Sequence, residues 1–265
     1  MAVVRHSMAT ETQRPPVWRS LLEFRAGLEG LLLLGGYPLL KKLPAGEGPV
    51  LVIPGFTTSD NSTFFLRRFL SELGYECHGW EQGVNRGLME DSFAALGDRL
   101  QQLYESSGQP VALIGWNVGG FYARALAHEY SECIKQVITL ATPFALPSVQ
   151  GVSRALNRLY RHINDDDSEM GIMNHSDAWE LPPPVPSTSI YSEGDGVTNW
   201  RYCLDEPGLQ TENIRIAGSH LGMTVNPLAY FVIADRLAED PRSWHSFADK
   251  HRGRLVLQGL TAGST

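Results

Sequence analysis

Three polar residues, each in a short turn after an apolar run, could together form a hydrolytic site. Asn117 lies in the turn GWNVG, Asp195 in SEGDGV and His220 in GSHLG. In nucleophilic catalysis, an acidic residue commonly orients a histidine, and the histidine activates a third residue. If the three preceding runs are parallel strands, their carboxyl ends meet at one edge of a sheet. We therefore expect these side chains to converge.

The turn around Asn117 has the form strand, Gly-x-X-x-Gly, helix over residues 111–120, VALIGWNVGG. Serine hydrolases use such a sharp strand-to-helix turn to expose a nucleophile. Gly115 and Gly119 would stand where strand and helix approach too closely for a Cβ atom. The Val118 N–H, at the start of the helix, could stabilise an oxyanion. A glycine-rich junction unrelated to hydrolysis would share this short pattern.

Two loops should lie at the same sheet edge as Asn117. After the run VLVI, the amide of Phe56 or Thr57 would supply a second oxyanion donor, and Thr57 and Trp116 are predicted to contact substrate. Trp116 and Phe56 could equally be core residues. In the polar loop 79–87, Asn85 or Arg86 could bind a substrate carboxylate or fix the loop, and fixing is the favoured interpretation.

Short apolar runs alternate with helical patterns along the chain. Predicted strands are Val50–Ile53, Tyr75–Trp80, Val111–Ile114, Gln136–Leu140, Thr188–Tyr191 and Asn213–Ala217. Helices are predicted at about Thr63–Leu73, Ser92–Ser106, Gly120–Tyr130 and Pro227–Ala238. This alternation indicates an α/β fold with a mostly parallel, doubly wound sheet of about six strands.

The predicted organisation is a polar tail (1–16) and one domain (17–265). The domain carries an insertion at about 144–186, which could be a small helical cap or a surface excursion. The leucine-rich stretch Leu21–Leu40 contains charges in its first half, and Gly35-Gly36 and Pro38 should break a helix in its second half. It therefore should not span a membrane. It could lie on a lipid surface, although docking on the domain core is favoured.

The composition excludes several classes of protein. The chain has 265 residues, 43% of them hydrophobic and 19% charged, and a formal net charge of −7. Such an acidic chain should not bind nucleic acid. Three scattered cysteines and an N-terminus without an apolar leader favour the cytoplasm. No spacing typical of metal ligands occurs, so no metal or cofactor is expected. The oligomeric state is left open.

The blocks VLVIPGF, GWNVGGFYARALA, VITLATPF, TSIYSEGDGV and GSHLGM resemble a bacterial lipase/esterase-like branch of the α/β-hydrolase superfamily, over roughly residues 48–238. The resemblance implies hydrolysis of a carboxylic ester, with a small ester or acyl molecule as substrate. It further implies that Asp195 orients His220, that His220 is the general base, and that the amides of Phe56 and Val118 form the oxyanion hole.

Position 117 departs from this family, which has serine there. Asparagine cannot readily form an acyl-enzyme, but it tolerates the positive φ of such a turn. The favoured hypothesis is an impaired or inactive hydrolase that still binds its ligand. Alternatives are a serine-independent enzyme that uses His220 and Asp195, deamidation of Asn117 to a nucleophilic aspartate, and a non-catalytic ligand-binding protein.

Overall fold

The protein is built around a parallel sheet with the strand order β2-β1-β3-β4-β5-β6. The computed structural model describes residues 15, 17–145, 179–206 and 208–252. The strands are β1 (Pro49–Ile53), β2 (Glu76–Gly79), β3 (Val111–Trp116), β4 (Ile134–Leu140), β5 (Ser187–Tyr191) and β6 (Thr211–Arg215). The six predicted strands are confirmed, as is the predicted parallel sheet.

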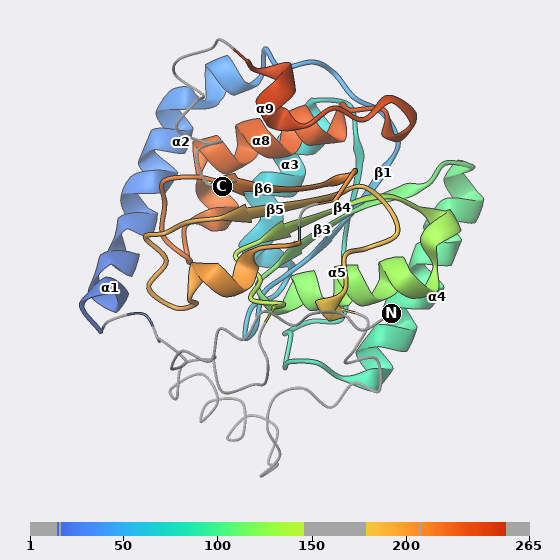
Figure 1. Ribbon diagram of the computed structural model, residues 1–265, viewed down its shortest axis with the longest axis horizontal. Helices are drawn as coiled ribbons and strands as arrows, with labels where there is room; N and C mark the ends of the chain where they lie inside the picture. Colours follow the sequence, from blue (N-terminus) through green and yellow to red (C-terminus); the bar gives the residue numbers. More distant parts are fainter. Residues whose placement is uncertain (1–14, 16, 146–178, 207, 253–265) are drawn as a thin grey trace.

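Helices cover both faces of this sheet, as Figure 1 shows with α8 and α9 above it and α4 and α5 below. The helices are α1 (Val17–Leu21), α2 (Ala26–Leu40), α3 (Phe64–Glu72), α4 (Glu90–Ser107), α5 (Val118–Glu129), α8 (Pro227–Leu237) and α9 (Phe247–Lys250). Short 3₁₀ helices lie at Leu22–Arg25, Asp60–Thr63, Ser131–Cys133, Trp200–Cys203, Met223–Val225 and Pro241–Ser243.

Two hydrophobic cores result from the alternation of side chains along the strands. In β1, Val50 and Val52 pack in the core that includes α3 and α8, whereas Leu51 and Ile53 pack in the core that includes α4 and α5. All four are almost fully buried. Burial on both faces explains why the strands read as continuous apolar runs in the sequence.

The leucine-rich stretch forms α1, a 3₁₀ turn and α2, which packs beside α8. The prediction that Gly35-Gly36 and Pro38 interrupt this helix is wrong, because α2 continues to Leu40. Pro38 lies in the last turn, and the carbonyl that it leaves without a partner belongs to Leu34, an exposed residue that water can reach. Among the described residues, no helix combines the length and apolarity needed to cross a membrane.

One buried arginine fixes both ends of the insertion predicted at 144–186. Arg124 of α5 is fully buried and pairs with Asp205 at 2.6 Å. Its guanidinium also lies 3.6 Å from the Phe144 ring and donates to the carbonyls of Trp179 (2.5 Å) and Leu181 (2.7 Å). Most of the predicted cap and nearly all of the predicted tail lie outside the described residues.

Replacement of this arginine should destabilise the whole domain. Arg124→Met leaves the Asp205 carboxylate buried without its cation, so we expect a loss of about 3–5 kcal/mol in the free energy of unfolding. Urea denaturation monitored by circular dichroism measures it. Arg68→Met is the matched control, since Arg68 pairs with Glu72 at the surface (3.1 Å), where water screens the pair, and the loss should be much smaller. Similar losses for the two variants would contradict this account.

Candidate active site

The junction of β3 and α5 is a sharp turn with Asn117 at its apex. Asn117 has φ 50° and ψ −114°, a strained conformation that asparagine tolerates better than most residues. A Cβ atom at Gly115 would lie 2.4 Å from the Gly119 carbonyl oxygen, and one at Gly119 would lie 2.3 Å from that of Ile53. Both glycines are therefore required by the close approach of strand and helix, as the sequence predicted.

Asp195 lies in the loop after β5 and is almost fully buried. Its Oδ1 accepts hydrogen bonds from the backbone N–H groups of Val197 (2.8 Å) and Thr198 (2.7 Å), and its Oδ2 accepts one from the Thr198 hydroxyl (2.9 Å). These three donors satisfy both oxygens of the carboxylate. The Asp195 side chain is thereby fixed in one orientation.

His220 follows β6 and joins the other two residues. Its Nδ1 lies 2.7 Å from Asp195 Oδ2, and its Nε2 lies 3.1 Å from Asn117 Nδ2. With a carboxylate at Nδ1 and an amide N–H at Nε2, the neutral imidazole carries its proton on Nδ1. The structure thus brings Asn117, Asp195 and His220 together in a buried chain of two hydrogen bonds, from loops at the carboxyl ends of three strands.

The basicity of His220 is set by opposing effects. Burial disfavours the charged imidazole, but the Asp195 carboxylate, and to a smaller extent that of Glu23, raises the pKa of His220 above its usual value. A histidine of this kind accepts a proton more readily than one in water. The arrangement therefore suits a general base.

Glu23 was not recognised as a site residue from the sequence. It is buried, and its Oε1 accepts the N–H groups of Gly196 (2.8 Å) and His220 (3.1 Å), while its Oε2 accepts that of Leu221 (2.8 Å). One carboxylate from the N-terminal segment therefore joins the loop of Asp195 to the loop of His220. Glu23 is a positioning residue.

Two further charged residues of the same segment fix these loops. Glu29 accepts the Ser219 N–H at 2.8 Å, and Arg25 donates to the carbonyls of Gly194 (2.8 Å) and Gly218 (3.1 Å). The only signal in the sequence was the spacing of opposite charges at i and i+4, as in Arg25 and Glu29. Such pairs usually face solvent, and here both side chains face the domain.

The predicted oxyanion loop is held by Asn85. This residue is fully buried, donates to the Pro54 carbonyl (2.8 Å) and accepts the Thr57 N–H on its own carbonyl (2.7 Å). Asn85 therefore fixes the loop, as the sequence favoured. Because the Thr57 amide is already bonded, Thr57 is the wrong candidate for an oxyanion donor. The role of the Phe56 amide stays a prediction. Val118 is the first residue of α5, where helical N–H groups lack intrahelical acceptors.

Trp116 lies at the site but is not exposed. Its ring centroid lies 6.0 Å from that of His220, and its indole packs against Gly55. The indole N–H is buried and has no hydrogen-bond partner among the described residues. Thr57, the other residue predicted to bind substrate, is exposed. The hydroxyl of the neighbouring Thr58 donates to the Gly55 carbonyl (2.8 Å).

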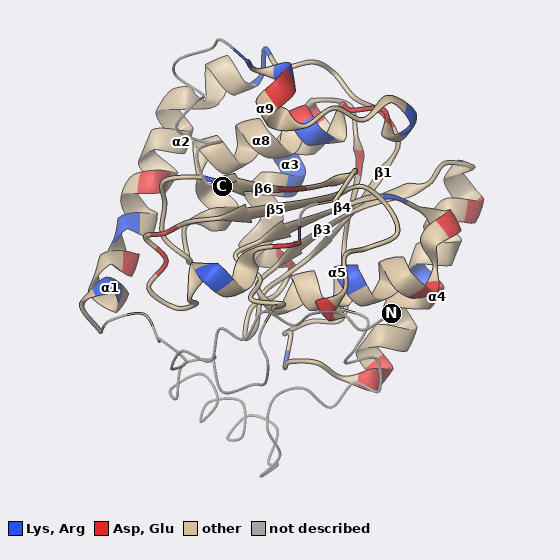
Figure 2. Ribbon diagram, in the orientation of Figure 1, with Lys and Arg blue, Asp and Glu red and all other residues tan. Residues whose placement is uncertain are grey.

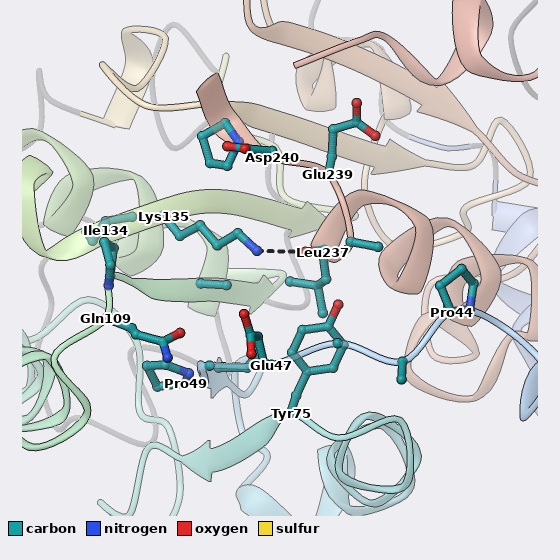
Figure 3. A pocket seen from close by; sticks show the side chains of 18 of the residues that line it. Pro44, Glu47, Pro49, Tyr75, Gln109, Ile134, Lys135, Leu237, Glu239 and Asp240 are labelled. Carbon is teal, nitrogen blue, oxygen red and sulfur yellow. Dashed lines mark hydrogen bonds between the residues drawn. The ribbon is translucent and has the colours of Figure 1, made fainter. Parts of the chain in front are cut away.

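A large hollow of about 890 Å³ lies elsewhere, at the amino ends of the strands (Figure 3). Pro49, Ile134 and Lys135 line it, and the Lys135 ammonium donates to the Leu237 carbonyl at 2.8 Å. It is thus opposite to the edge that carries His220. Within the described part of the chain, no cluster of three or more histidine, cysteine or acidic side chains could hold a metal ion.

Comparison with solved structures identifies the architecture. Aspergillus fumigatus lipase B matches with a TM-score of 0.57 and 16% identity, over 74% of this chain but only 53% of the lipase. One of two metagenome-derived lipolytic enzymes matches with a TM-score of 0.54 and 17% identity, over 73% of this chain and 93% of its own. The fold is that of an α/β-hydrolase. No family model matches the sequence, nor does any curated protein.

A thioesterase domain from the curacin biosynthetic pathway also has this fold, with a TM-score of 0.50 and 16% identity, over 74% of this chain and 91% of that domain. In an α/β-hydrolase fold, residues at the carboxyl edge of the sheet form the site. Asn117, Asp195 and His220 occupy that edge here. At 16–17% identity, the structural matches show the fold and not the chemistry.

Removal of the Glu23 charge should lower the pKa of His220. The imidazole of the unaltered protein should titrate above about 6.5, the value for histidine in unstructured peptides, and Glu23→Gln should shift the midpoint downward. Proton–nitrogen NMR of ring-labelled histidine measures it. Glu29→Gln is the matched control, because Glu29 bonds the Ser219 amide and not that of His220, and its shift should be smaller.

The same titration predicts how stability depends on pH. Since folding raises the pKa of His220, its contribution is fully present below about pH 6.5 and is lost as pH rises through the folded pKa. Glu23→Gln should reduce this contribution. An unchanged titration in Glu23→Gln, or an equal shift in Glu29→Gln, would mean that Glu23 acts only as a structural brace.

Proposed function

We propose that this protein is a carboxylic ester hydrolase of the α/β-hydrolase fold, impaired by Asn117 at the position of the nucleophile, that still binds an ester or acyl molecule in its site. The observation that carries the proposal is the chain of hydrogen bonds from Asn117 to His220 (3.1 Å) and from His220 to Asp195 (2.7 Å) at the strand-to-helix turn. The lipases and the thioesterase that share the fold support the ester class of ligand.

The chemistry of Asn117 determines what such a site can do. A serine hydroxyl would lose its proton to His220 Nε2 while its oxygen attacked the carbonyl carbon, and the amides of Phe56 and Val118 would stabilise the oxyanion. The carboxamide of Asn117 is a far poorer nucleophile because its nitrogen lone pair is delocalised. Its N–H instead occupies His220 Nε2. The protein should therefore bind its ligand but should not form an acyl-enzyme.

A second candidate is a serine-independent enzyme. His220 is held at Nδ1 by Asp195 and has a raised pKa, which favours proton abstraction from a bound water or substrate. In that reaction the Asn117 amide would bind an oxyanion. A third candidate, from another class, is a non-catalytic protein that holds an ester or acyl ligand in the same site.

The substitution Asn117→Ser should create esterase activity. We expect an increase in kcat on the order of 10⁴-fold, by analogy with the loss on removal of a triad residue. The assay uses chromogenic esters of graded acyl length, and a fluorophosphonate probe should label the serine variant and leave the asparagine form unlabelled. Asn117→Ala is the matched control, since it removes the amide without adding a nucleophile.

His220→Ala separates the candidates. Activity that appears only in Asn117→Ser, and disappears when His220→Ala is added, supports the impaired hydrolase. Activity already present in the asparagine form and lost in His220→Ala would instead identify the serine-independent enzyme. A serine variant that is neither labelled nor active, while the asparagine form still binds a long-chain ester analogue, would favour the non-catalytic binder.

A further inference from the structure

The N-terminal segment 18–40 has its polarity reversed relative to an ordinary surface helix. Its four charged side chains are buried or half-buried and face the domain, and Glu23, Arg25 and Glu29 bond the loops of the site described above. Between Trp18 and Leu40 no charged side chain is exposed. An ordinary surface helix places its charges toward water and its leucines toward the core.

Large apolar side chains cover the opposite side of this segment. We call the leucine face the set Leu21, Phe24, Leu28, Leu31, Leu34 and Leu39. The exposed fraction of these residues runs from 58% for Leu28 to 86% for Phe24. Most of them follow each other at intervals of three or four residues, so they share one side of the helical segment. A continuous apolar surface of this kind marks a contact with lipid or with another protein.

The scarcity of exposed polar side chains distinguishes these two occupants. Protein interfaces carry about one hydrogen bond per 100–200 Å², which fixes the partner in register. The only exposed polar side chain between Trp18 and Leu40 is Ser20, and its hydroxyl already donates to the Gly196 carbonyl (3.0 Å). Hydrocarbon chains of a lipid require no such donors or acceptors. The leucine face therefore fits acyl chains better than a protein surface.

Positive charge lies at the C-terminal end of the leucine face. Lys41 and Lys42 follow α2 and are exposed, and Lys41 shares the Glu72 carboxylate with Arg68 (both 3.1 Å), so this end keeps excess positive charge. At the other end Arg19 is half-buried and donates to the Glu193 carbonyl (2.8 Å), so it faces the domain. Figure 2 shows no charged residue along the upper part of α2. In a chain of net charge −7, this local pattern complements anionic headgroups.

We propose that the leucine face docks on the surface of a bilayer that contains anionic phospholipids. The segment would lie along the surface, because its other side is bonded to the domain through Glu23 and Glu29. Leu221, the residue after His220, is 52% exposed and its N–H is held by Glu23, so the loop of His220 lies beside the segment. Docking would bring the site beside the lipid.

Vesicle flotation of the full chain tests this proposal without any need for catalysis. The probe is a vesicle of phosphatidylcholine and phosphatidylglycerol in equal amounts. We expect the protein to float with these vesicles, less well with pure phosphatidylcholine, and less well at high salt. The double substitution Leu31→Gln and Leu34→Gln should weaken binding by about tenfold or more, because it removes two apolar side chains that would enter the lipid. Glutamine keeps the helix stable.

Leu209→Gln is the matched control, because Leu209 is 97% exposed and lies outside the segment, so binding should be unchanged. Circular dichroism should show that all variants are folded. Protein that stays below the vesicles, or a double variant that floats as well as Leu209→Gln, would overturn the proposal. So would a dimer in analytical ultracentrifugation that the double substitution dissociates, because the occupant of the leucine face would then be a second copy.

Discussion

The hydrogen bond between His220 and Asp195 is the constraint around which the carboxyl edge of the sheet is organised. It joins loops that follow two adjacent strands, and it is buried, so neither partner can be left unsatisfied at low cost. Glu23, from the N-terminal segment, holds both loops in place, because its carboxylate accepts hydrogen bonds from a backbone N–H of each. The N-terminal segment is therefore part of the site and not an appendage to it.

Asn117 is compatible with every structural requirement of its position. It adopts the positive φ of the turn and offers an N–H to His220 where a hydroxyl would otherwise stand. The proposed loss of a nucleophile thus leaves the surrounding bonds in place. Under the proposed function, Asp195 and His220 keep their hydrogen bonds and only the group at position 117 is changed. This is why the binding and catalytic hypotheses can be separated by a single substitution.

The sequence predicted the strands, their direction and the convergence of three residues, because apolar runs and glycine-rich turns are local signals. Strand ends were less accurate for reasons visible in the structure. The second strand stops before Trp80, whose N–H is taken by Asp60 (2.9 Å), and begins after Tyr75, whose N–H is taken by Leu70 (3.1 Å). Glu23 could not be found in this way, since its partners lie more than 170 residues further along the chain.

The anchoring of the insertion by Arg124 has a consequence for how this fold can change. Phe144 on one side and Trp179 on the other meet at one guanidinium, so the chain between them starts and ends at nearly the same point. The entropy of closing such a loop grows slowly with its length, by about 0.6 kcal/mol per doubling. Segments of different size and composition can therefore be exchanged there by evolution or by engineering, while the sheet and its hydrogen-bonded edge stay untouched.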